Sequence, residues 1–290
     1  MITDDLHLDD RLKQVRTLLL DCFSSSSLND LVRDNPAILA SGKMLRSRLV
    51  FRVGTATGAD PETLVYAATA VEMIHAASLI HDDVIDEGRI RRGAPAFWVE
   101  RGVPAAILLG DFLLIKSMDI ICRTGMALAQ PMVTYASEMC MAESEQELIQ
   151  RGGRVSWNDY VRVARSKTGS LFAFAGYACA QHNEELGKAL AESGYRVGTA
   201  YQLADDILDA VGSPESSGKT LGTDDARKKI TAMNFVNEHE SVDPVHEIKG
   251  LCREAEELLA PWPEVREAWN AYMERDMGPG LQRTLGRLEQ

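Results

Sequence analysis

The spacing of apolar residues constrains the fold of this chain more than any other feature of its sequence. Apolar side chains recur every three or four residues through six segments, at 6–23, 61–86, 104–121, 130–150, 186–211 and 246–273. This period is that of α-helices with one buried face. No segment sustains the alternation of every second residue that is typical of a half-buried β-strand. The sequence therefore predicts an all-α protein.

The interruptions between these segments are short and rich in Gly, Pro and polar side chains. They lie at 58–61, 87–95, 151–157, 212–222 and 240–244. None is long enough to be a convincing interdomain linker. We therefore expect residues 1–290 to form one helical domain, with a frayed end after Gly280.

The charge composition excludes some functions. The chain has 43 acidic against 31 basic residues and a net charge of -12, which argues against a general nucleic-acid-binding protein. No run approaches the roughly 20 apolar residues of a membrane span, and the acidic start MITDDLHLDD is unlike a signal peptide. We therefore expect a cytoplasmic protein without a membrane span. The five cysteines are single and far apart, so we expect small core residues rather than a zinc site or disulfides.

Residues 61–87 are interpreted as one long helix. Asp60 is a good N-cap, Pro61 suits the first helical position and Gly88 is a natural stop. A stripe at spacings of three and four runs along this helix through Glu72, His75, Leu79, Asp82 and Asp86. Apolar residues cover the remaining faces, so the helix should be buried. Its polar stripe should then line an internal cavity.

The stripe ends in an unusual concentration of negative charge. Asp82, Asp83 and Asp86 lie in the last turn, where the helix dipole disfavours each anion by roughly 0.3–1 kcal/mol. For an aspartate pair taken alone, a solvated acidic face is the simpler interpretation. A divalent cation would offset the repulsion between these carboxylates. Oxygen ligands with no cysteine close by favour Mg²⁺ over zinc.

A second aspartate cluster repeats this pattern, because Asp205, Asp206 and Asp209 close the apolar segment 186–211 just before a Gly/Pro stop. Two such clusters, facing each other across a cavity, could hold several Mg²⁺ ions and bind a diphosphate. Cations that suit the same ligand occur in compact motifs. They are Lys43 with Arg46, Arg91 with Arg92, Lys167, Lys219, and Lys228 with Lys229. Each of them, taken singly, is also explained as a solvated surface charge.

These motifs resemble those of the trans-isoprenyl diphosphate synthases, also called polyprenyl synthetases. HDDVIDEGRIRRG (81–93) resembles the first aspartate-rich motif of that family, and YQLADDILD (201–209) resembles the second. The likeness covers roughly residues 40–277 and includes SGKMLRSR, VEMIHAASLIHDD, LLGDFLL, SKTGSLF and SGKTLGTDDARKKIT. It implies a single large helical bundle around a central cavity. It also implies a Mg²⁺-dependent prenyltransferase that condenses an allylic diphosphate head to tail with isopentenyl diphosphate.

The resemblance further implies a role for individual residues. The ligands that it implies for three Mg²⁺ ions are Asp82, Asp86 and Asp205, supported by Asp83, Asp206 and Asp209. Those implied to hold the allylic diphosphate are Arg91, Lys167 and Lys219. Those implied to hold isopentenyl diphosphate are Lys43, Arg46, His75 and Arg92, with Lys229 as a further substrate-binding residue. Thr168 and Gln202 match polar groups beside the reacting carbons, and together with Lys167 and Lys219 they form the expected catalytic set.

In the family, product length depends on how far the cavity extends below the first motif. Ala77 and Ser78 stand five and four residues before the first aspartate, where an aromatic side chain stops elongation early. Both are small, so we expect products longer than fifteen carbons, geranylgeranyl diphosphate or longer. Residues that could close the tunnel lower down are Met73, Ile74, Met118 and Phe172, although plain core packing is the simpler explanation for each of them.

Two alternative functions share part of this pattern. A class I terpene cyclase would have the same fold, Mg²⁺ and the first motif, but it usually lacks a second motif of the DDILD type. A non-catalytic partner subunit often loses an aspartate motif, whereas both are present here. Met44 and Ser47 replace the Arg and Pro that the family usually has. The family is usually homodimeric, so we expect a homodimer.

Overall fold

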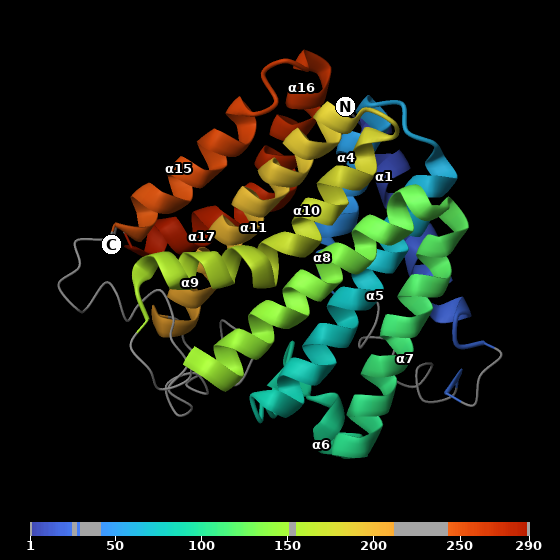
Figure 1. The fold of residues 1–290 in the computed structure, drawn as a ribbon, viewed down its shortest axis with the longest axis vertical. Coiled ribbons are helices and arrows are strands. Elements are labelled where there is room, and N and C mark those ends of the chain that lie inside the picture. Colours follow the sequence, from blue (N-terminus) through green and yellow to red (C-terminus); the bar gives the residue numbers. More distant parts are fainter. Residues whose placement is uncertain (1, 25–27, 30–41, 151–154, 212–242, 289–290) are drawn as a thin grey trace.

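The computed structural model describes residues 2–24, 28–29, 42–150, 155–211 and 243–288. Within these residues the chain is almost entirely helical, which confirms the predicted all-α class (Figure 1). The helices of the first half are α1 (Ile2–Asp21), α4 (Leu45–Ala56), α5 (Pro61–Ile85), α6 (Phe97–Arg101), α7 (Val103–Ile121) and α8 (Met126–Glu145). Those of the second half are α9 (Trp157–Ala164), α10 (Ser170–Tyr177), α11 (Glu184–Val211), α15 (Pro244–Glu257), α16 (Pro263–Tyr272) and α17 (Gly278–Leu288).

Short elements join these helices. The 3-10 turns are η1 (Cys122–Thr124) and η4 (Ala178–Ala180), and the π-helical turns are η2 (Gln146–Gln150), η3 (Arg165–Gly169) and η5 (Met273–Met277). A small antiparallel hairpin, β1 (Ile90–Arg91) with β2 (Ala94–Pro95), follows α5. Its two-residue turn has positive φ angles at both Arg92 (55°) and Gly93 (78°), as tight hairpins require.

Helix α10 lies at the centre of the bundle. It contacts α4, α5, α8 and α11, and every residue from Ser170 to Gly176 is buried. Helices α15 and α16 lie on one side of this centre and α6 and α7 on the other (Figure 1). The apolar period of the sequence therefore becomes one continuous core, to which nearly all helices contribute.

Helix α5 forms as its sequence predicts. The Asp60 carboxylate accepts a hydrogen bond from the Thr63 N–H at 2.8 Å, Pro61 stands in the first turn, and Asp86 is the C-cap. Among the described helices, α5 alone is long and apolar enough to cross a membrane. However, 67% of the apolar stretch of this helix is buried inside the protein. The helix packs chiefly against α7 and thus serves as a core helix.

Helices α10 and α11 approach one another so closely that the contact requires glycine. A Cβ atom at Gly194 would lie 2.3 Å from the Phe172 carbonyl oxygen. One at Gly198 would lie 2.5 Å from the Cα atom of Gly169. Both distances are well inside van der Waals contact, so any larger residue would force the two backbones apart. The contact fixes η3 and α10 against α11.

The end of the chain departs from the sequence prediction. The apolar segment 246–273 forms two helices, α15 and α16, because Pro261 and Pro263 interrupt it. The chain does not fray after Gly280, because α17 continues to Leu288 and packs on α11. Leu281 is buried at this contact. Only a few apolar residues around Leu281 follow the helical period, so the local sequence indicates a helix only weakly. Burial against the bundle stabilises this helix instead.

A buried carboxylate ties this C-terminal region to α4. Asp276, in η5, accepts a hydrogen bond from Arg48 Nη1 at 3.0 Å and another from Arg52 Nε. The Asp276 side chain is only 3% exposed, so the two guanidinium groups neutralise a charge that water does not reach.

The prediction for the cysteines is only partly right. All five are free thiols. Cys179 is buried in the core, but Cys122 and Cys140 are exposed. Cys140 lies in the wall of the cavity described below, so it is not a core residue.

Candidate active site

A cavity of about 770 Å³ lies among α5, α8, η3 and α11, and the β1–β2 hairpin contributes to its wall. Fourteen of the predicted site residues line it: Lys43, Arg46, His75, Ser78, Asp82, Asp83, Asp86, Arg91, Arg92, Lys167, Thr168, Gln202, Asp205 and Asp206. Apolar parts of the wall come from Leu114, Met139, Val163, Leu171 and Phe172. Segments far apart in the sequence thus converge on one space. The predicted Lys219 and Lys229 lie outside the described residues.

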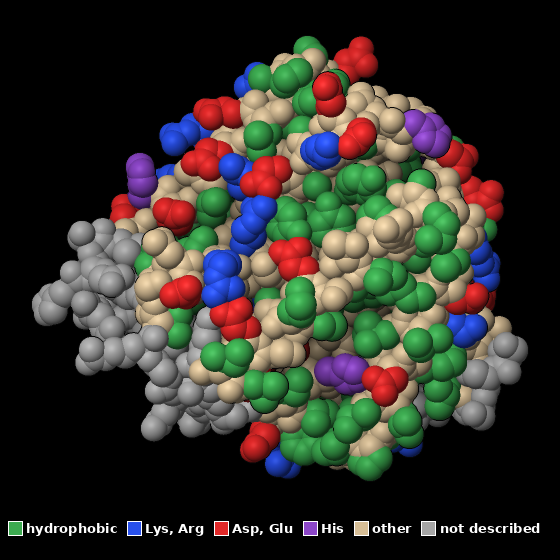
Figure 2. Space-filling model, viewed as in Figure 1, with side chains coloured by type: hydrophobic (Ala, Val, Ile, Leu, Met, Phe, Trp, Pro, Cys, Tyr) green, Lys and Arg blue, Asp and Glu red, His purple; other side chains and the backbone are tan. Residues whose placement is uncertain are grey.

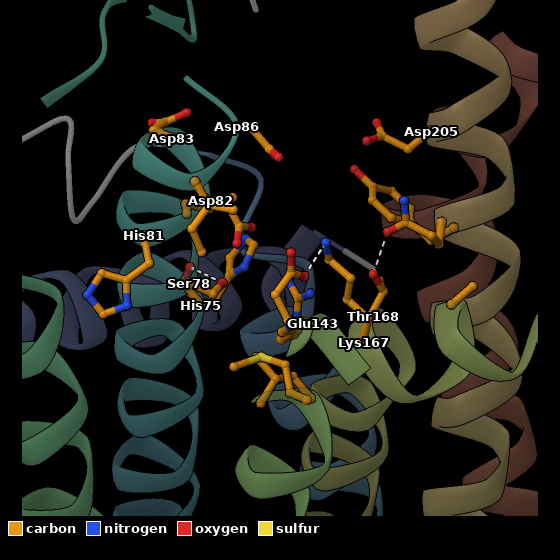
Figure 3. Close-up of a pocket in the computed structure, with 18 of the residues that line it drawn as sticks. His75, Ser78, His81, Asp82, Asp83, Asp86, Glu143, Lys167, Thr168 and Asp205 are labelled. Carbon is orange, nitrogen blue, oxygen red and sulfur yellow. Dashed lines mark hydrogen bonds and ion pairs between the residues drawn. The ribbon is translucent and has the colours of Figure 1, made fainter. Parts of the chain in front are cut away.

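The three aspartates of the first motif point in different directions. Asp82 and Asp86 line the cavity, and Figure 3 shows the Asp86 carboxylate directed toward α11. Asp83 is buried and accepts hydrogen bonds from Arg91, at 3.0 Å from Nε and 2.6 Å from Nη2. Burial raises the pKa of Asp83, although the Arg91 charge acts in the opposite direction. Asp83 therefore holds Arg91 in place at the edge of the cavity.

The second motif faces the first. Asp205 and Asp86 project from opposite helices into the same space (Figure 3). Asp206 accepts a hydrogen bond from the phenol of Tyr160 on one oxygen and from Gln202 Nε2 on the other, at 2.7 Å. Asp209 lies in α11, but its side chain is outside the described residues. Asp206 is thus fixed by neighbours, while Asp205 faces the cavity.

These carboxylates suit a metal that is bound together with its substrate. Among the described residues, no group of three or more His, Cys, Asp or Glu side chains is already arranged to hold a metal ion. Mg²⁺ typically takes one or two carboxylates and completes its coordination with water and substrate phosphates. Asp82, Asp86 and Asp205 fit that pattern because they are carboxylates spread around one cavity.

The π-helical turn η3 aims Lys167 and Thr168 into the cavity. Its first residues are held outside, because Arg165 pairs with Glu192 at 2.6 Å and Ser166 donates to Glu138 at 2.7 Å. Such turns are often found at functional sites, where they change which side chains face inward. The Thr168 hydroxyl donates to Gln202 Oε1 across the gap to α11. The predicted pair Thr168 and Gln202 is therefore in direct contact.

Lys167 has two partners on α8 and η2. Its ammonium forms an ion pair with the Glu143 carboxylate, drawn as a dashed line in Figure 3, and donates to Gln146 Oε1 at 3.1 Å. Both partners line the cavity. The sequence prediction missed them, although Glu143 follows Met139 and Cys140 at helical spacings of four and three, which could have indicated a common face.

The cations predicted for isopentenyl diphosphate lie around a half-buried histidine, His75. Burial, followed by the charges of Arg46 and Arg92, lowers the pKa of His75 well below its ordinary value. The Arg46 guanidinium lies 4.5 Å from the centre of the Phe172 ring, and its Nε has no hydrogen-bond partner among the described residues. Burial, together with the charge of Arg283 on α17, lowers the pKa of Lys43. An anion here would find several cationic donors close together.

Ser47, one of the two departures from the family pattern, has a defined contact. Its N–H and its hydroxyl both donate to Glu72 Oε1, at 3.2 and 2.8 Å. A proline at this position could not donate the first of these bonds. Ser47 therefore fixes a carboxylate that stands on the same helix stripe as His75.

The two positions predicted to control product length differ in their surroundings. Ser78 lines the cavity, and its hydroxyl donates to the His75 carbonyl oxygen at 2.9 Å. Ala77 is fully buried and does not belong to the described cavity wall. Of the four residues considered for the tunnel floor, Phe172 lines the cavity, whereas Met73 and Ile74 are fully buried in the core and Met118 packs against it.

The all-helical fold is shared with solved isoprenyl diphosphate synthases. The chain belongs to the polyprenyl synthetase family, whose model matches residues 29–256. It is 36% identical over 205 residues to a short chain isoprenyl diphosphate synthase of Methanothermobacter thermautotrophicus. That match spans 68% of this chain and 63% of the archaeal protein.

Two crystal structures show the same fold at low sequence identity. A polyprenyl synthase from Caulobacter crescentus, complexed with calcium and isoprenyl diphosphate, matches with a TM-score of 0.80 and 24% identity, over 96% of this chain and 97% of that one. A geranyltransferase from Helicobacter pylori, complexed with magnesium and isoprenyl diphosphate, matches with a TM-score of 0.74 and 19% identity. Its match covers 93% of this chain and 96% of that one.

Proposed function

We propose that this protein is a Mg²⁺-dependent trans-polyprenyl diphosphate synthase, which joins an allylic diphosphate head to tail with isopentenyl diphosphate. The observation that carries the proposal is that Asp82, Asp86 and Asp205 share one cavity with a set of cations and an apolar wall. Membership of the polyprenyl synthetase family supports the same reaction class.

Three Mg²⁺ ions are proposed to bind Asp82, Asp86 and Asp205, with Asp83, Asp206 and Asp209 in support. Their donor set consists of hard oxygen atoms, and two relatives of the same fold were crystallised with calcium or magnesium and isoprenyl diphosphate. Bound Mg²⁺ would supply positive charge that stabilises a departing diphosphate. Asp83 acts indirectly, because it is engaged with Arg91.

The allylic diphosphate is proposed to lie against Arg91 and Lys167, with Lys219 as a third cation. These charges favour ionisation of the allylic C–O bond because they stabilise the leaving diphosphate. Thr168 and Gln202, which hydrogen-bond to each other, would present a hydroxyl and an amide to the reacting carbons. Apolar wall residues such as Leu171 and Phe172 would exclude water from the resulting carbocation.

Isopentenyl diphosphate is proposed to bind at the second group of cations, Lys43, Arg46 and Arg92, beside His75, with Lys229 contributing from outside the described residues. Because His75 is kept neutral by burial, it can donate one hydrogen bond to a phosphate without adding charge. The double bond of this substrate would then face the allylic carbon across Thr168.

For the product we propose a chain of more than fifteen carbons. Ser78 is small and lines the cavity, so it leaves the space below the first motif open. The archaeal relative is named a short chain synthase, which is compatible with a product near geranylgeranyl diphosphate.

We further propose a cytoplasmic homodimer. Apolar side chains on α7 and α8 are exposed although they are large: Ile107, Leu108, Ile115, Met126, Val133 and Met141. Figure 2 shows hydrophobic side chains gathered over the face that these helices form. A second copy of the chain would remove that surface from water. In solution the mass should then be twice the 31.9 kDa of one chain.

The test of the reaction is mass analysis of the products formed from isopentenyl diphosphate with dimethylallyl, geranyl or farnesyl diphosphate. We expect trans-polyprenyl diphosphates that include an extended product from farnesyl diphosphate, and no product after Mg²⁺ is chelated. The variant Asp205→Asn should be inactive. The control Asp119→Asn, on α7 and paired with Lys116 at 3.6 Å, should retain activity.

Other outcomes would identify other functions. A cyclic hydrocarbon formed from an allylic diphosphate, with isopentenyl diphosphate unconsumed, would identify a class I terpene cyclase. Absence of turnover by the purified protein with every primer would instead favour a non-catalytic partner subunit.

A further inference from the structure

Among the described cations of the proposed allylic site, only Lys167 pairs with a carboxylate that belongs to neither aspartate motif. Its partner Glu143 comes from α8, the helix that packs against η3. The two side chains are only 18% and 17% exposed, so water screens their attraction less than it screens a surface pair. Lys167 and Glu143 therefore form a largely buried ion pair at the cavity wall.

The Glu143 carboxylate is incompletely satisfied. One oxygen pairs with Lys167, while Oε1 is buried and has no hydrogen-bond partner among the described residues. A buried acceptor without a partner destabilises the folded protein. A structural salt bridge would be expected to satisfy both oxygens, as Glu192 does with Arg165. Glu143 is thus placed at a cost in stability beside a residue that binds substrate.

A bound diphosphate would compete with Glu143 for the same ammonium. Lys167 is a flexible point charge that can move between two anions on one cavity wall. Gln146, one turn beyond Glu143, accepts from Lys167 without charge and can keep the lysine nearby when the ion pair opens. By contrast, Arg91 is held by three hydrogen bonds to Asp83 and cannot exchange partners so readily.

We propose that Glu143 is a positioning residue that competes with diphosphate for Lys167 and so limits how tightly diphosphate is held. The proposal rests on the proposed function, because it takes Lys167 as a ligand of the allylic diphosphate. Before the substrate arrives, Glu143 neutralises Lys167 within the cavity. When the diphosphate product leaves, Glu143 recaptures the ammonium, which favours release over retention.

The test is the affinity for inorganic pyrophosphate with Mg²⁺, measured by calorimetry on the full-length protein. Glu143→Gln keeps the shape of the side chain and an acceptor for Lys167 but removes the charge. We expect this variant to bind pyrophosphate more tightly, on the order of tenfold. The KM for the allylic diphosphate should fall by a similar factor, while the KM for isopentenyl diphosphate stays unchanged.

Three controls isolate the effect. Glu145→Gln changes the next glutamate of α8, which pairs with Arg162 outside the described cavity wall, and should leave pyrophosphate binding unchanged. Glu143→Asp retains the charge and should stay close to the unmodified protein. In a Lys167→Met background, Glu143→Gln should have no further effect, because the competition requires the lysine.

Weaker or unchanged pyrophosphate binding by Glu143→Gln would overturn the proposal, as would an equal gain in the Lys167→Met background. Thermal unfolding of each variant shows whether it is folded, and Glu143→Ala, which also removes the charge, takes the place of Glu143→Gln if that variant is unfolded. A wrong proposed function would give a different result from a wrong role for Glu143. In that case the unmodified protein itself would show no condensation activity with any primer.

Discussion

Tyr160 of α9 donates its phenolic hydrogen to Asp206 of α11, a contact between residues 46 positions apart. Gln202 donates to the other oxygen of the same carboxylate and accepts from Thr168. One hydrogen-bonded chain therefore joins the second aspartate motif to the threonine of η3. The orientation of Thr168 and Gln202 depends on a tyrosine that belongs to neither motif.

The first prediction concerns this tyrosine. Tyr160→Phe removes one hydrogen bond to a carboxylate, a contribution of about 1.5–3 kcal/mol, so Asp206 and Gln202 lose part of their fixed orientation. We expect kcat to fall by about tenfold or more. Steady-state kinetics with saturating substrates measures this. The control Tyr135→Phe, in the aromatic cluster with Phe174 and Tyr177, should leave kcat unchanged. An unaltered kcat in Tyr160→Phe would contradict the role assigned to this network.

A second prediction concerns pH and His75. Its pKa is lowered by burial in the folded protein, whereas the unfolded chain takes up a proton below about pH 6.5. The unfolded state therefore binds more protons, and the free energy of unfolding falls as the pH drops below that value, by at most about 1.4 kcal/mol per pH unit.

Urea unfolding at pH 7.5 and at pH 5.5 measures this loss. We expect His75→Gln to lose less stability between the two values than the unmodified protein, because the titrating group is gone. His182→Gln, at an exposed position, should behave like the unmodified protein. Equal losses in all three proteins would show that His75 does not carry the effect.

A third prediction concerns the buried carboxylate of η5. Asp276→Ala leaves Arg48 and Arg52 without their shared counter-ion in a site that is almost fully buried. We expect the free energy of unfolding to fall by about 3 kcal/mol or more. Denaturant titration measures it, with Asp10→Ala as the matched control. That change removes an exposed ion pair to Lys13, so it should have no measurable effect. If Asp276→Ala loses no more stability than the control, Asp276 does not hold α4 and the C-terminal region together.

A fourth prediction concerns product length. Ser78→Phe places an aromatic ring directly in the cavity, and we expect it to shift products toward shorter chains. Ala77→Phe should also shorten the product, but Ala77 is fully buried, so this larger side chain must first displace its neighbours. A loss of thermal stability should therefore accompany Ala77→Phe and be smaller in Ser78→Phe. Product distributions identical to that of the unmodified protein would exclude both residues from control of chain length.

The parts of this structure that follow local rules could be predicted from the sequence. Asp60 and Pro61 mark the start of α5, and the stripe from Glu72 to Asp86 follows from the helical period alone. The two aspartate motifs meet in one cavity because each closes an apolar helix of the bundle.

Other parts depend on tertiary contacts that leave little trace in the sequence. The π-helical turn η3 has no characteristic period, so the inward direction of both Lys167 and Thr168 could not be derived. Glu143 is one glutamate among several near the end of α8, and only its contact with Lys167 distinguishes it. The helix after Gly280 was missed because burial of Leu281 against the bundle, and not local propensity, supports it.

The glycine contact between α10 and α11 also limits how the protein can move. At Gly194 and Gly198 the two backbones touch with no side chain between them, so neither helix can slide without a clash. Thr168 and Gln202 are attached to this rigid pair and keep a constant separation. In the proposed reaction, extra room for a growing hydrocarbon would therefore have to come from the cavity wall that α5 forms.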